Sequence, residues 1–263
     1  MHLLDLEHLR DLTCDLSAEN LLALSLMQPG ALERLNVLDW DVSLAVPVSA
    51  AFWRHASQVA TAVTVSARIN LSGGEYESAS GAEQLAACTP LSDCRVDAVA
   101  NFAIVLEALC PRNCPKLERI YMFAPASVEL SPLQNLTQLE RLMLTLQSSA
   151  GNRAIKAIAG LAALLPTSLR KLNLKITHPV PSLLDVTLLA SISCHCPQLT
   201  ALNFASPCVT CDELASVEEA VRGLQLRLQL DCRVTITDAE SLRLARNLPW
   251  RAQVSVLDVY RIW

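Results

Sequence analysis

Two groups of cysteines in the C-terminal half of the chain have a spacing that could hold a metal ion. Cys194 and Cys196 flank His195, and after 11 intervening residues Cys208 and Cys211 form a second pair. Paired cysteines with a histidine nearby are typical ligands of a structural zinc site. A zinc-stabilised or thiol-based activity that uses these four cysteines is therefore one interpretation. The repeat described below opposes it, because it places the first pair before a strand and the second pair at the strand's far end.

Motifs of the common enzyme classes are absent from the sequence. It contains no H-E-x-x-H, G-x-S-x-G, G-x-x-x-x-G-K-[ST] or G-x-G-x-x-G motif. The glycine cluster in residues 71–81 lacks the lysine of a phosphate-binding loop and indicates a surface loop. A reactive cysteine partnered by His55, His178 or His195 is the remaining catalytic interpretation. We predict instead a protein that is not an enzyme, has no metal or cofactor, and takes no small-molecule substrate.

The composition favours a repeated architecture. The 263 residues are 52% hydrophobic but only 4% aromatic. The core must then be built from leucine, alanine, valine and isoleucine, which suits many similar layers better than one core centred on aromatic rings. The net charge of −5 gives no broad basic field, so nucleic acid is not expected as a partner.

The N-terminal residues and the cysteine content bear on location. The start MHLLDLEHLRDL carries three acidic residues and no basic segment, so it does not resemble a secretory signal. The most apolar segment, residues 157–165, is too short to span a bilayer, and no membrane partner is expected. Ten cysteines without an export signal predict a reducing compartment, either the cytoplasm or the nucleus.

A short leucine motif recurs along the chain, and we call each copy a rung. The five best matches to L-x-x-L-x-L are LERLNV from Leu32, LERIYM from Leu117, LERLML from Leu139, LRKLNL from Leu169 and LTALNF from Leu199. The last four start 22, 30 and 30 residues apart, close to the period of about 20–29 residues in leucine-rich repeats. Each rung is expected to form one strand.

Weaker copies extend the series. ATAVTV from Ala60 and RAQVSV from Arg251 keep the apolar alternation, and GLQLRLQL in residues 223–230 alternates as a half-buried strand does. No convincing rung is visible between Ala60 and Leu117. Residues 66–95 are therefore predicted to be irregular or an insertion.

Helices are expected between the rungs. The apolar period there changes from 2 to about 3.6, as in residues 99–109 and 155–165. Capping boxes at Ser80–Glu83, Thr210–Glu213 and Thr237–Glu240 predict helix starts. Since neither a strand nor a helix of one unit can bury its apolar face alone, stacking of units would make the fold stable.

The domain prediction follows from this stacking. Residues 1–263 are predicted to form a single solenoid of about seven to nine strand–helix units, with residues 1–28 as an N-terminal cap. The chain ends on the apolar VSVLDVYRIW. Because the ends of a solenoid need polar caps, a piece of a longer protein would also fit this sequence.

Two segments resemble cysteine-containing leucine-rich repeats. They are ITDAESLRLARNLP in residues 236–249 and LLASISCHCPQLTALNF in residues 188–204. In that family I-T-D leads into a helix, and C-P-x-L-x-x-L-x-L opens the next strand. The resemblance covers about residues 96–263 and is to the ribonuclease-inhibitor-like subfamily. It implies an α/β solenoid with parallel strands on the concave face and helices on the convex face.

The Cys-Pro pairs that start at Cys114 and Cys196 have a physical role in this scheme. Proline lacks an amide donor and disfavours helical angles in the residue before it, so it ends the helix. Cysteine is small and apolar, and it is expected to fill the space under the bend.

The family resemblance also implies a function. Repeats of this kind occur in the substrate-binding domains of F-box ubiquitin-ligase adaptors, so a protein–protein interaction scaffold is implied, with substrate recognition for a ubiquitin ligase as one role. No F-box motif is visible in the N-terminal residues. The ninth repeat position also departs from the family's asparagine or cysteine, as it holds Trp40, Pro125, Gln147, Thr177 and Pro207.

The residues between the leucines define the candidate binding surface. They alternate with the buried positions and therefore face away from the helices, on the side where solenoids usually bind partners. The predicted contacts are Arg34, Arg119, Tyr121, Phe123, Arg141, Met143, Lys171, Asn173 and Asn203.

Two interpretations of the basic residues in this set remain open. Glutamates such as Glu33, Glu118 and Glu140 stand at the preceding rung position and could pair with arginines on neighbouring rungs, as a solvated ladder of small energetic value. Alternatively, the arginines form a recognition stripe for an acidic segment of a protein partner, since arginine binds carboxylates through two parallel hydrogen bonds.

Overall fold

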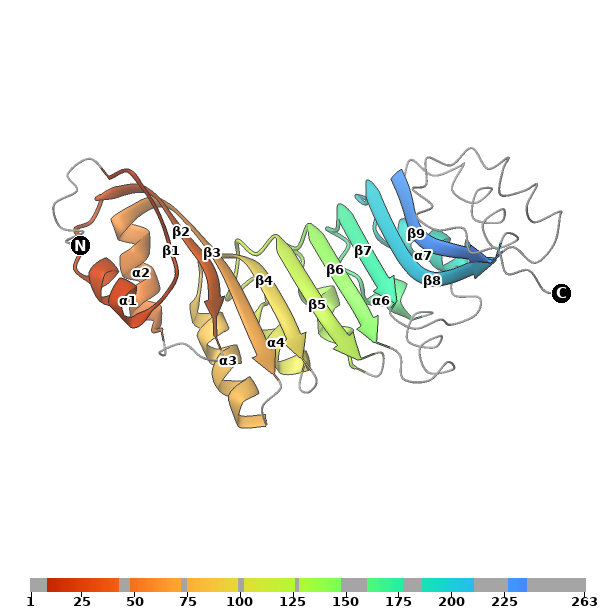
Figure 1. Cartoon of the computed structure of the whole chain (residues 1–263), viewed down its shortest axis with the longest axis horizontal. Coiled ribbons are helices and arrows are strands. Elements are labelled where there is room, and N and C mark those ends of the chain that lie inside the picture. Colours follow the sequence, from red (N-terminus) through yellow and green to blue (C-terminus); the bar gives the residue numbers. More distant parts are fainter. Residues whose placement is uncertain are drawn as a thin grey trace. The chain divides into compact units, whose positions relative to one another are not determined.

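Strands and helices alternate along the chain in an α/β fold (Figure 1). The computed structural model describes residues 9–42, 48–71, 75–98, 102–125, 128–147, 160–176, 186–210 and 227–235. In these residues the order of strands in the sheet follows the sequence, from β1 to β9. The helices in this part of the chain include none that is long and apolar enough to cross a membrane.

Most strands are followed by a helix before the next strand begins. The strands are β1 (Asp11–Cys14), β2 (Leu32–Asp41), β3 (Ala60–Leu71), β4 (Leu91–Ala98), β5 (Arg119–Pro125), β6 (Arg141–Gln147), β7 (Lys171–Ile176), β8 (Ala201–Thr210) and β9 (Arg227–Thr235). The helices are α1 (Ala18–Ser25), α2 (Ala50–Val59), α3 (Glu75–Ala87), α4 (Phe102–Ala108), the 3-10 helix η2 (Ser131–Asn135), α6 (Leu161–Leu164) and α7 (Val186–His195). Strands β1 to β4 pair in parallel, and so do β6 to β9.

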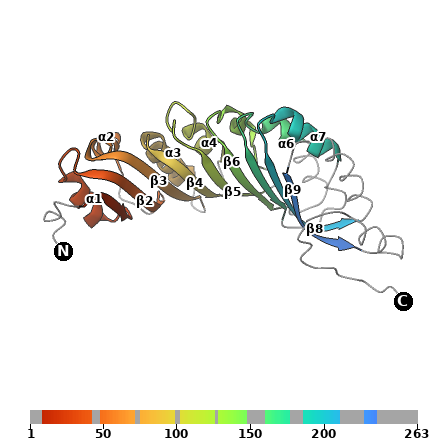
Figure 2. The same cartoon turned by 90° about the horizontal axis from the view of Figure 1, so that it is seen from above.

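The chain divides into two compact units. The first is Met1–Tyr121 with Asn135–Leu139, and the second is Met122–Gln134 with Glu140–Trp263. In the first unit α2, α3 and α4 lie on one side of the strands, and in the second α6 and α7 do (Figure 2). Each unit therefore has a sheet face that these helices leave uncovered, which we call the open face. The arrangement is consistent with a solenoid-like α/β fold, while a single solenoid over residues 1–263 stays a prediction.

The leucine rungs form strands because their apolar residues are buried under the helices. In β2, Leu35 and Val37 are at most 1% exposed, whereas the residues between them face out. Parallel register sets Leu142, Leu172 and Leu202 of β6, β7 and β8 side by side, all nearly fully buried. Burial of one leucine side chain contributes about 1.5–3 kcal/mol, so stacked rungs stabilise one another.

Both Cys-Pro pairs place a buried cysteine before the next strand, since Cys114 and Cys196 are at most 1% exposed. Cys196 directly follows α7, whereas α4 already ends at Ala108, so the prediction that the pair ends the helix is confirmed only at Cys196. The Cys114 thiol donates to the backbone oxygen of Leu85 at 3.4 Å, and the Cys196 thiol donates to that of Pro166 at 3.5 Å. Each acceptor belongs to the preceding strand–helix unit. The cysteine therefore both fills the bend and bonds one repeat to the previous one.

The described residues between 66 and 95 form regular elements, so the prediction of an irregular segment or insertion there is wrong. They contain the end of β3, all of α3 and the start of β4. In β4 the fully buried residues Leu91, Cys94 and Val96 occupy the three apolar rung positions. A cysteine replaces the central leucine, which hid this rung in the sequence. The helix start predicted at Ser80 is also wrong, because Ser80 lies inside α3.

The N-terminal residues 1–28 contain a further strand and helix. Strand β1 pairs with β2, with Leu12 opposite Leu35. Helix α1 begins after Ser17, whose hydroxyl accepts a hydrogen bond from the amide of Asn20 at 3.3 Å. This segment is thus built like the units that follow it, and its role as a cap stays a prediction.

Candidate partner-binding surface

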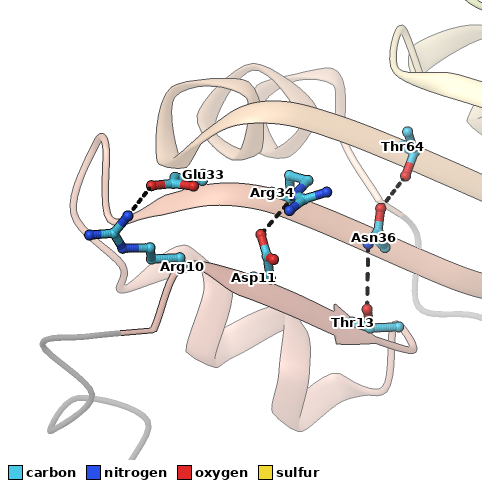
Figure 3. A network of polar contacts seen from close by, with 7 residues as sticks. All are labelled: Arg10, Asp11, Thr13, Glu33, Arg34, Asn36 and Thr64. Atoms are coloured by element: carbon cyan, nitrogen blue, oxygen red, sulfur yellow. Dashed lines mark hydrogen bonds and ion pairs between the residues drawn. The ribbon is translucent and has the colours of Figure 1, made fainter.

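Ion pairs link the outermost strands on the open face of the first unit (Figure 3). The guanidinium of Arg10 lies 3.0 Å from the Glu33 carboxylate, and that of Arg34 lies 2.9 Å from Asp11. Arg34 and Asp11 are opposite each other in the register of β1 and β2. All four side chains are more than half exposed, so each pair contributes little to stability. They nevertheless neutralise Arg34, the first of the predicted contacts.

A short ladder of polar side chains runs beside these pairs. The Thr64 hydroxyl donates to the Asn36 side-chain oxygen at 2.5 Å, and the Asn36 amide donates to the Thr13 hydroxyl at 3.5 Å. The three residues are register partners on β1, β2 and β3 and point to the same side of the sheet (Figure 3). In this rung the ninth position, where cysteine-containing leucine-rich repeats carry asparagine or cysteine, holds Trp40, and the polar ladder lies four positions earlier, at Asn36.

A second group of ion pairs joins residues of β2, β3 and β4. Arg68 lies 3.0 Å from Asp39 and 4.0 Å from Asp41, and Arg95 lies 2.8 Å from Asp97. Asp39 has a φ of 50° and stands where the register between β2 and β3 shifts. Aspartate tolerates this left-handed conformation better than most residues, because its short side chain can bond locally.

The best-buried ion pair of this face joins Arg119 of β5 to Asp93 of β4. Nη2 of Arg119 donates to one carboxylate oxygen of Asp93, and Nε lies against the other. The Asp93 side chain is 14% exposed and that of Arg119 is 39% exposed. Arg119 is therefore held by its own chain. Arg34 and Arg119 thus each have an acidic partner within the chain, and their role as partner contacts stays a prediction.

The open face of the second unit has a different charge pattern. Arg141, Lys171 and Lys175 are exposed, and none of them forms an ion pair with another described residue. Arg141 is the register partner of Lys171 on the neighbouring strand. An ion pair in this region, Arg170 with Glu140 at 3.6 Å, joins two residues of the preceding rung position, whereas the predicted ladder paired such glutamates with the arginines of the next position. Two like charges thus stand side by side on an acidic protein.

Apolar and amide side chains lie on the same face. Phe123 and Met143 are 40% and 37% exposed, so both offer apolar area on this face. Met143 is the register partner of Asn173, which in turn pairs with Asn203, and both amides are half-exposed. Tyr121, the remaining predicted contact, is 40% exposed and belongs to the first unit. Exposed apolar groups beside arginine are typical of protein-binding surfaces.

The cysteines with zinc-like spacing do not converge in the described residues. Cys194 is exposed at the end of α7, whereas Cys196 is buried. Cys208 lies on β8, seven residues after the start of this strand, a distance of about 23 Å at about 3.3 Å per residue. Cys211 lies outside the described residues. Those that are described hold no group of three or more His, Cys, Asp or Glu side chains suited to a metal ion.

Three other cysteines, Cys88, Cys94 and Cys114, are buried together in the first unit. Burial raises the pKa of Cys114 to about 12, with a smaller contribution from Cys110. Burial and neighbouring thiols likewise raise the pKa of Cys88 and Cys94 well above the usual value. The thiolate is the nucleophilic form of cysteine, so these buried side chains act as small apolar groups at neutral pH.

Two of the histidines considered as partners of a reactive thiol, His55 and His195, lie in the described residues. Nε2 of His195 lies 3.0 Å from the backbone oxygen of Leu165. His55 is half-buried on α2, and His178 lies outside the described residues. The ring of His195 is thus held by a backbone group of the preceding repeat.

Comparison with known proteins adds no family to this picture. The sequence matches no protein-family model and no curated protein sequence. The function must therefore be inferred from the fold and from the open face.

Proposed function

We propose that this chain is a leucine-rich repeat protein of the ribonuclease-inhibitor-like type, which acts as a non-catalytic protein-interaction module. Parallel strands with buried leucines and Cys-Pro turns that bond successive repeats support the family assignment. In such a scaffold the helices pack against one face of the sheet and form the core with it. The open face, whose side chains point away from the core, is the surface on which a partner protein binds.

The observation that carries this proposal is the unpaired cationic face of the second unit. Arg141, Lys171 and Lys175 form no ion pair with another described residue, and Phe123 and Met143 add exposed apolar area. A partner with an acidic segment and one or two apolar side chains would complement both features. We therefore expect the second unit to carry the main contacts, together with Asn173 and Asn203.

The cysteines support an intracellular setting for this role. Seven cysteines in the described residues are free, and those that are buried serve as packing groups. Such thiols persist in a reducing compartment, so the cytoplasm or the nucleus is the proposed location. The resemblance to F-box adaptor repeats extends the proposal to recognition of a ubiquitin-ligase substrate, with the F-box supplied by another chain or segment.

The test is affinity purification from cells with mass spectrometry, using the wild-type chain and two charge-reversed variants. Arg141→Glu/Lys171→Glu alters the open face, and Arg112→Glu/Lys116→Glu makes the same change of charge at exposed positions before β5. Circular dichroism verifies that each variant is folded. We expect a set of partners to be lost only with the first variant. Equal partner sets for both variants would contradict the proposal.

A further inference from the structure

The open faces of the two units differ in whether their basic residues have acidic partners. In the first unit a basic residue of the strands is opposed by an acidic residue, as Arg34 is by Asp11 and Arg119 is by Asp93. In the second unit the equivalent rung position holds Arg141 and then Lys171, with no acid among the described residues to separate them. Like charges directly opposite in a sheet destabilise it. An external anion would remove this repulsion.

The geometry sets the size of that anion. Register partners on neighbouring strands lie about 4.8 Å apart, so the guanidinium of Arg141 and the ammonium of Lys171 can contact one small group at the same time. A single carboxylate carries one charge and neutralises only one of the two. A phosphorylated side chain carries a charge of about −1.5 to −2 and three acceptor oxygens, which matches both cations. Arginine supplies paired donors to it, and lysine supplies a point charge.

A third cation extends the site along one strand. Lys175 lies four residues beyond Lys171 on the same side of β7, about 13 Å away at about 3.3 Å per residue. Asn173 stands between the two lysines, and its half-exposed amide faces the same side. An extended peptide that lies along β7 would place its residue i at the Arg141–Lys171 pair and its residue i+4 at Lys175.

We propose that Arg141 and Lys171 together bind one phosphorylated serine or threonine of an extended partner segment, and that Lys175 binds an acidic residue four positions away. This inference rests on the proposed protein-binding function of the open face. Phosphorylation of the partner would then control its binding, because the unmodified hydroxyl leaves both cations without an anion. A nucleic acid also carries phosphate, but the net charge of −5 opposes a long polyanion.

The experiment measures binding of the full chain to three synthetic pools of degenerate peptides by fluorescence anisotropy. Each pool has a glutamate fixed at position i+4, and position i is phosphoserine, aspartate or serine. We expect the phosphoserine pool to bind at least about tenfold more tightly than the aspartate pool, because it adds charge-assisted hydrogen bonds. The advantage should vanish in Arg141→Gln/Lys171→Gln and persist in the charge-matched control Arg112→Gln/Lys116→Gln.

The pH dependence separates the two anions. The second pKa of a phosphoserine is about 6, so affinity for the phosphoserine pool should fall between about pH 7 and pH 5. Affinity for the aspartate pool should stay nearly constant in this range, since aspartate titrates near pH 3.9. Equal binding of the phosphoserine and aspartate pools, an advantage retained by Arg141→Gln/Lys171→Gln, or tighter binding of a single-stranded oligouridine would overturn the inference.

A phosphatase step distinguishes this failure from failure of the proposed function. Partners captured from cells on the immobilised wild-type chain are compared before and after phosphatase treatment of the lysate. Loss of the partners after treatment supports the phosphate site. Partners that survive treatment but are lost with Arg141→Glu/Lys171→Glu refute the phosphate site and leave the open face as a binding surface. Partners that survive both refute the two proposals together.

Discussion

Replacement of Arg119 by alanine is expected to lower the free energy of unfolding by about 1–3 kcal/mol, a range bounded by values for exposed and buried ion pairs. Arg119 is the best-shielded basic residue among the predicted contacts. Its guanidinium holds both carboxylate oxygens of Asp93, whose side chain is 14% exposed. Alanine would leave this carboxylate poorly solvated, because the single proton of the Ser92 hydroxyl, 3.3 Å away, is shared with the backbone oxygen of Val65 at 3.1 Å.

The magnitude follows from the partial burial of the pair. An exposed ion pair contributes about 0–1 kcal/mol, whereas loss of one partner of a buried pair costs about 3–5 kcal/mol. Arg119 is 39% exposed, so water screens part of its interaction and the upper value does not apply. A coupling energy of about 1 kcal/mol between Arg119 and Asp93 is expected in a double-mutant cycle, as for residues that share a salt bridge.

Urea unfolding followed by circular dichroism measures this effect as a shift of the midpoint at constant slope. The variants are Arg119→Ala, Asp93→Ala and their combination, with Arg141→Ala as the control. Arg141 has no ion-pair partner in the described residues, so its replacement should change stability by no more than about 0.5 kcal/mol. If the urea midpoints of Arg119→Ala and Arg141→Ala were equal, the ion pair of Arg119 with Asp93 would not stabilise the fold, and the distinction between paired and unpaired arginines would be wrong.

Three other properties can be predicted from the described residues. Gly81→Ala should destabilise the chain by about 1 kcal/mol in urea unfolding, because the new Cβ would lie 2.6 Å from Cδ1 of the fully buried Ile69, and this clash outweighs the better helix propensity of alanine. Replacing Ile69 by valine in the Gly81→Ala variant should recover part of the loss. A Gly81→Ala variant more stable than the wild type would refute this packing. Ser49→Ala should cost about 1 kcal/mol in the same assay, since the Ser49 hydroxyl caps α2, and an unchanged midpoint would argue against the cap. Burial raises the pKa of Cys114 to about 12, so the thiol ionises at lower pH in the unfolded chain, and the free energy of unfolding should fall as the pH rises from about 9 towards 12. This fall should be smaller in Cys114→Ala. In the native chain near pH 7.5, an alkylating reagent should modify the exposed Cys194 before the buried Cys114.

Much of the fold could be predicted from the sequence, because burial imposes a strict alternation on each strand. Leucines at rung positions, such as Leu35 and Leu142, are buried as the period requires. The rung of β4 was missed because Cys94 replaces the central leucine. A buried thiol packs like a small aliphatic group, but it does not match a motif that requires leucine at this position. Cysteines at spacings suggestive of metal ligation were more useful as markers of repeat ends.

The candidate site could be predicted only in part. Alternation placed Arg34, Arg119 and Arg141 on the open face, and this follows from the sequence alone. Which of them is neutralised depends on the residue of the neighbouring strand that lies beside it. Asp11, the register partner of Arg34, lies on β1, and Asp93, the partner of Arg119, lies on β4. The leucine motif revealed neither of these two strands, so the sequence pointed to glutamates instead.

The unpaired cations of the second unit are tolerable for folding and useful for binding for the same reason. Charges that are exposed to solvent repel one another by less than about 1 kcal/mol, so leaving Arg141 and Lys171 without an acid costs the isolated chain little. When a partner covers them, water is excluded and the same charges interact with an opposing anion far more strongly. The paired arginines of the first unit cannot give this gain, because an incoming anion would first have to displace Asp11 or Asp93. If the proposed binding function holds, the unpaired cations on β6 and β7 are therefore the contacts that gain most from an acidic partner.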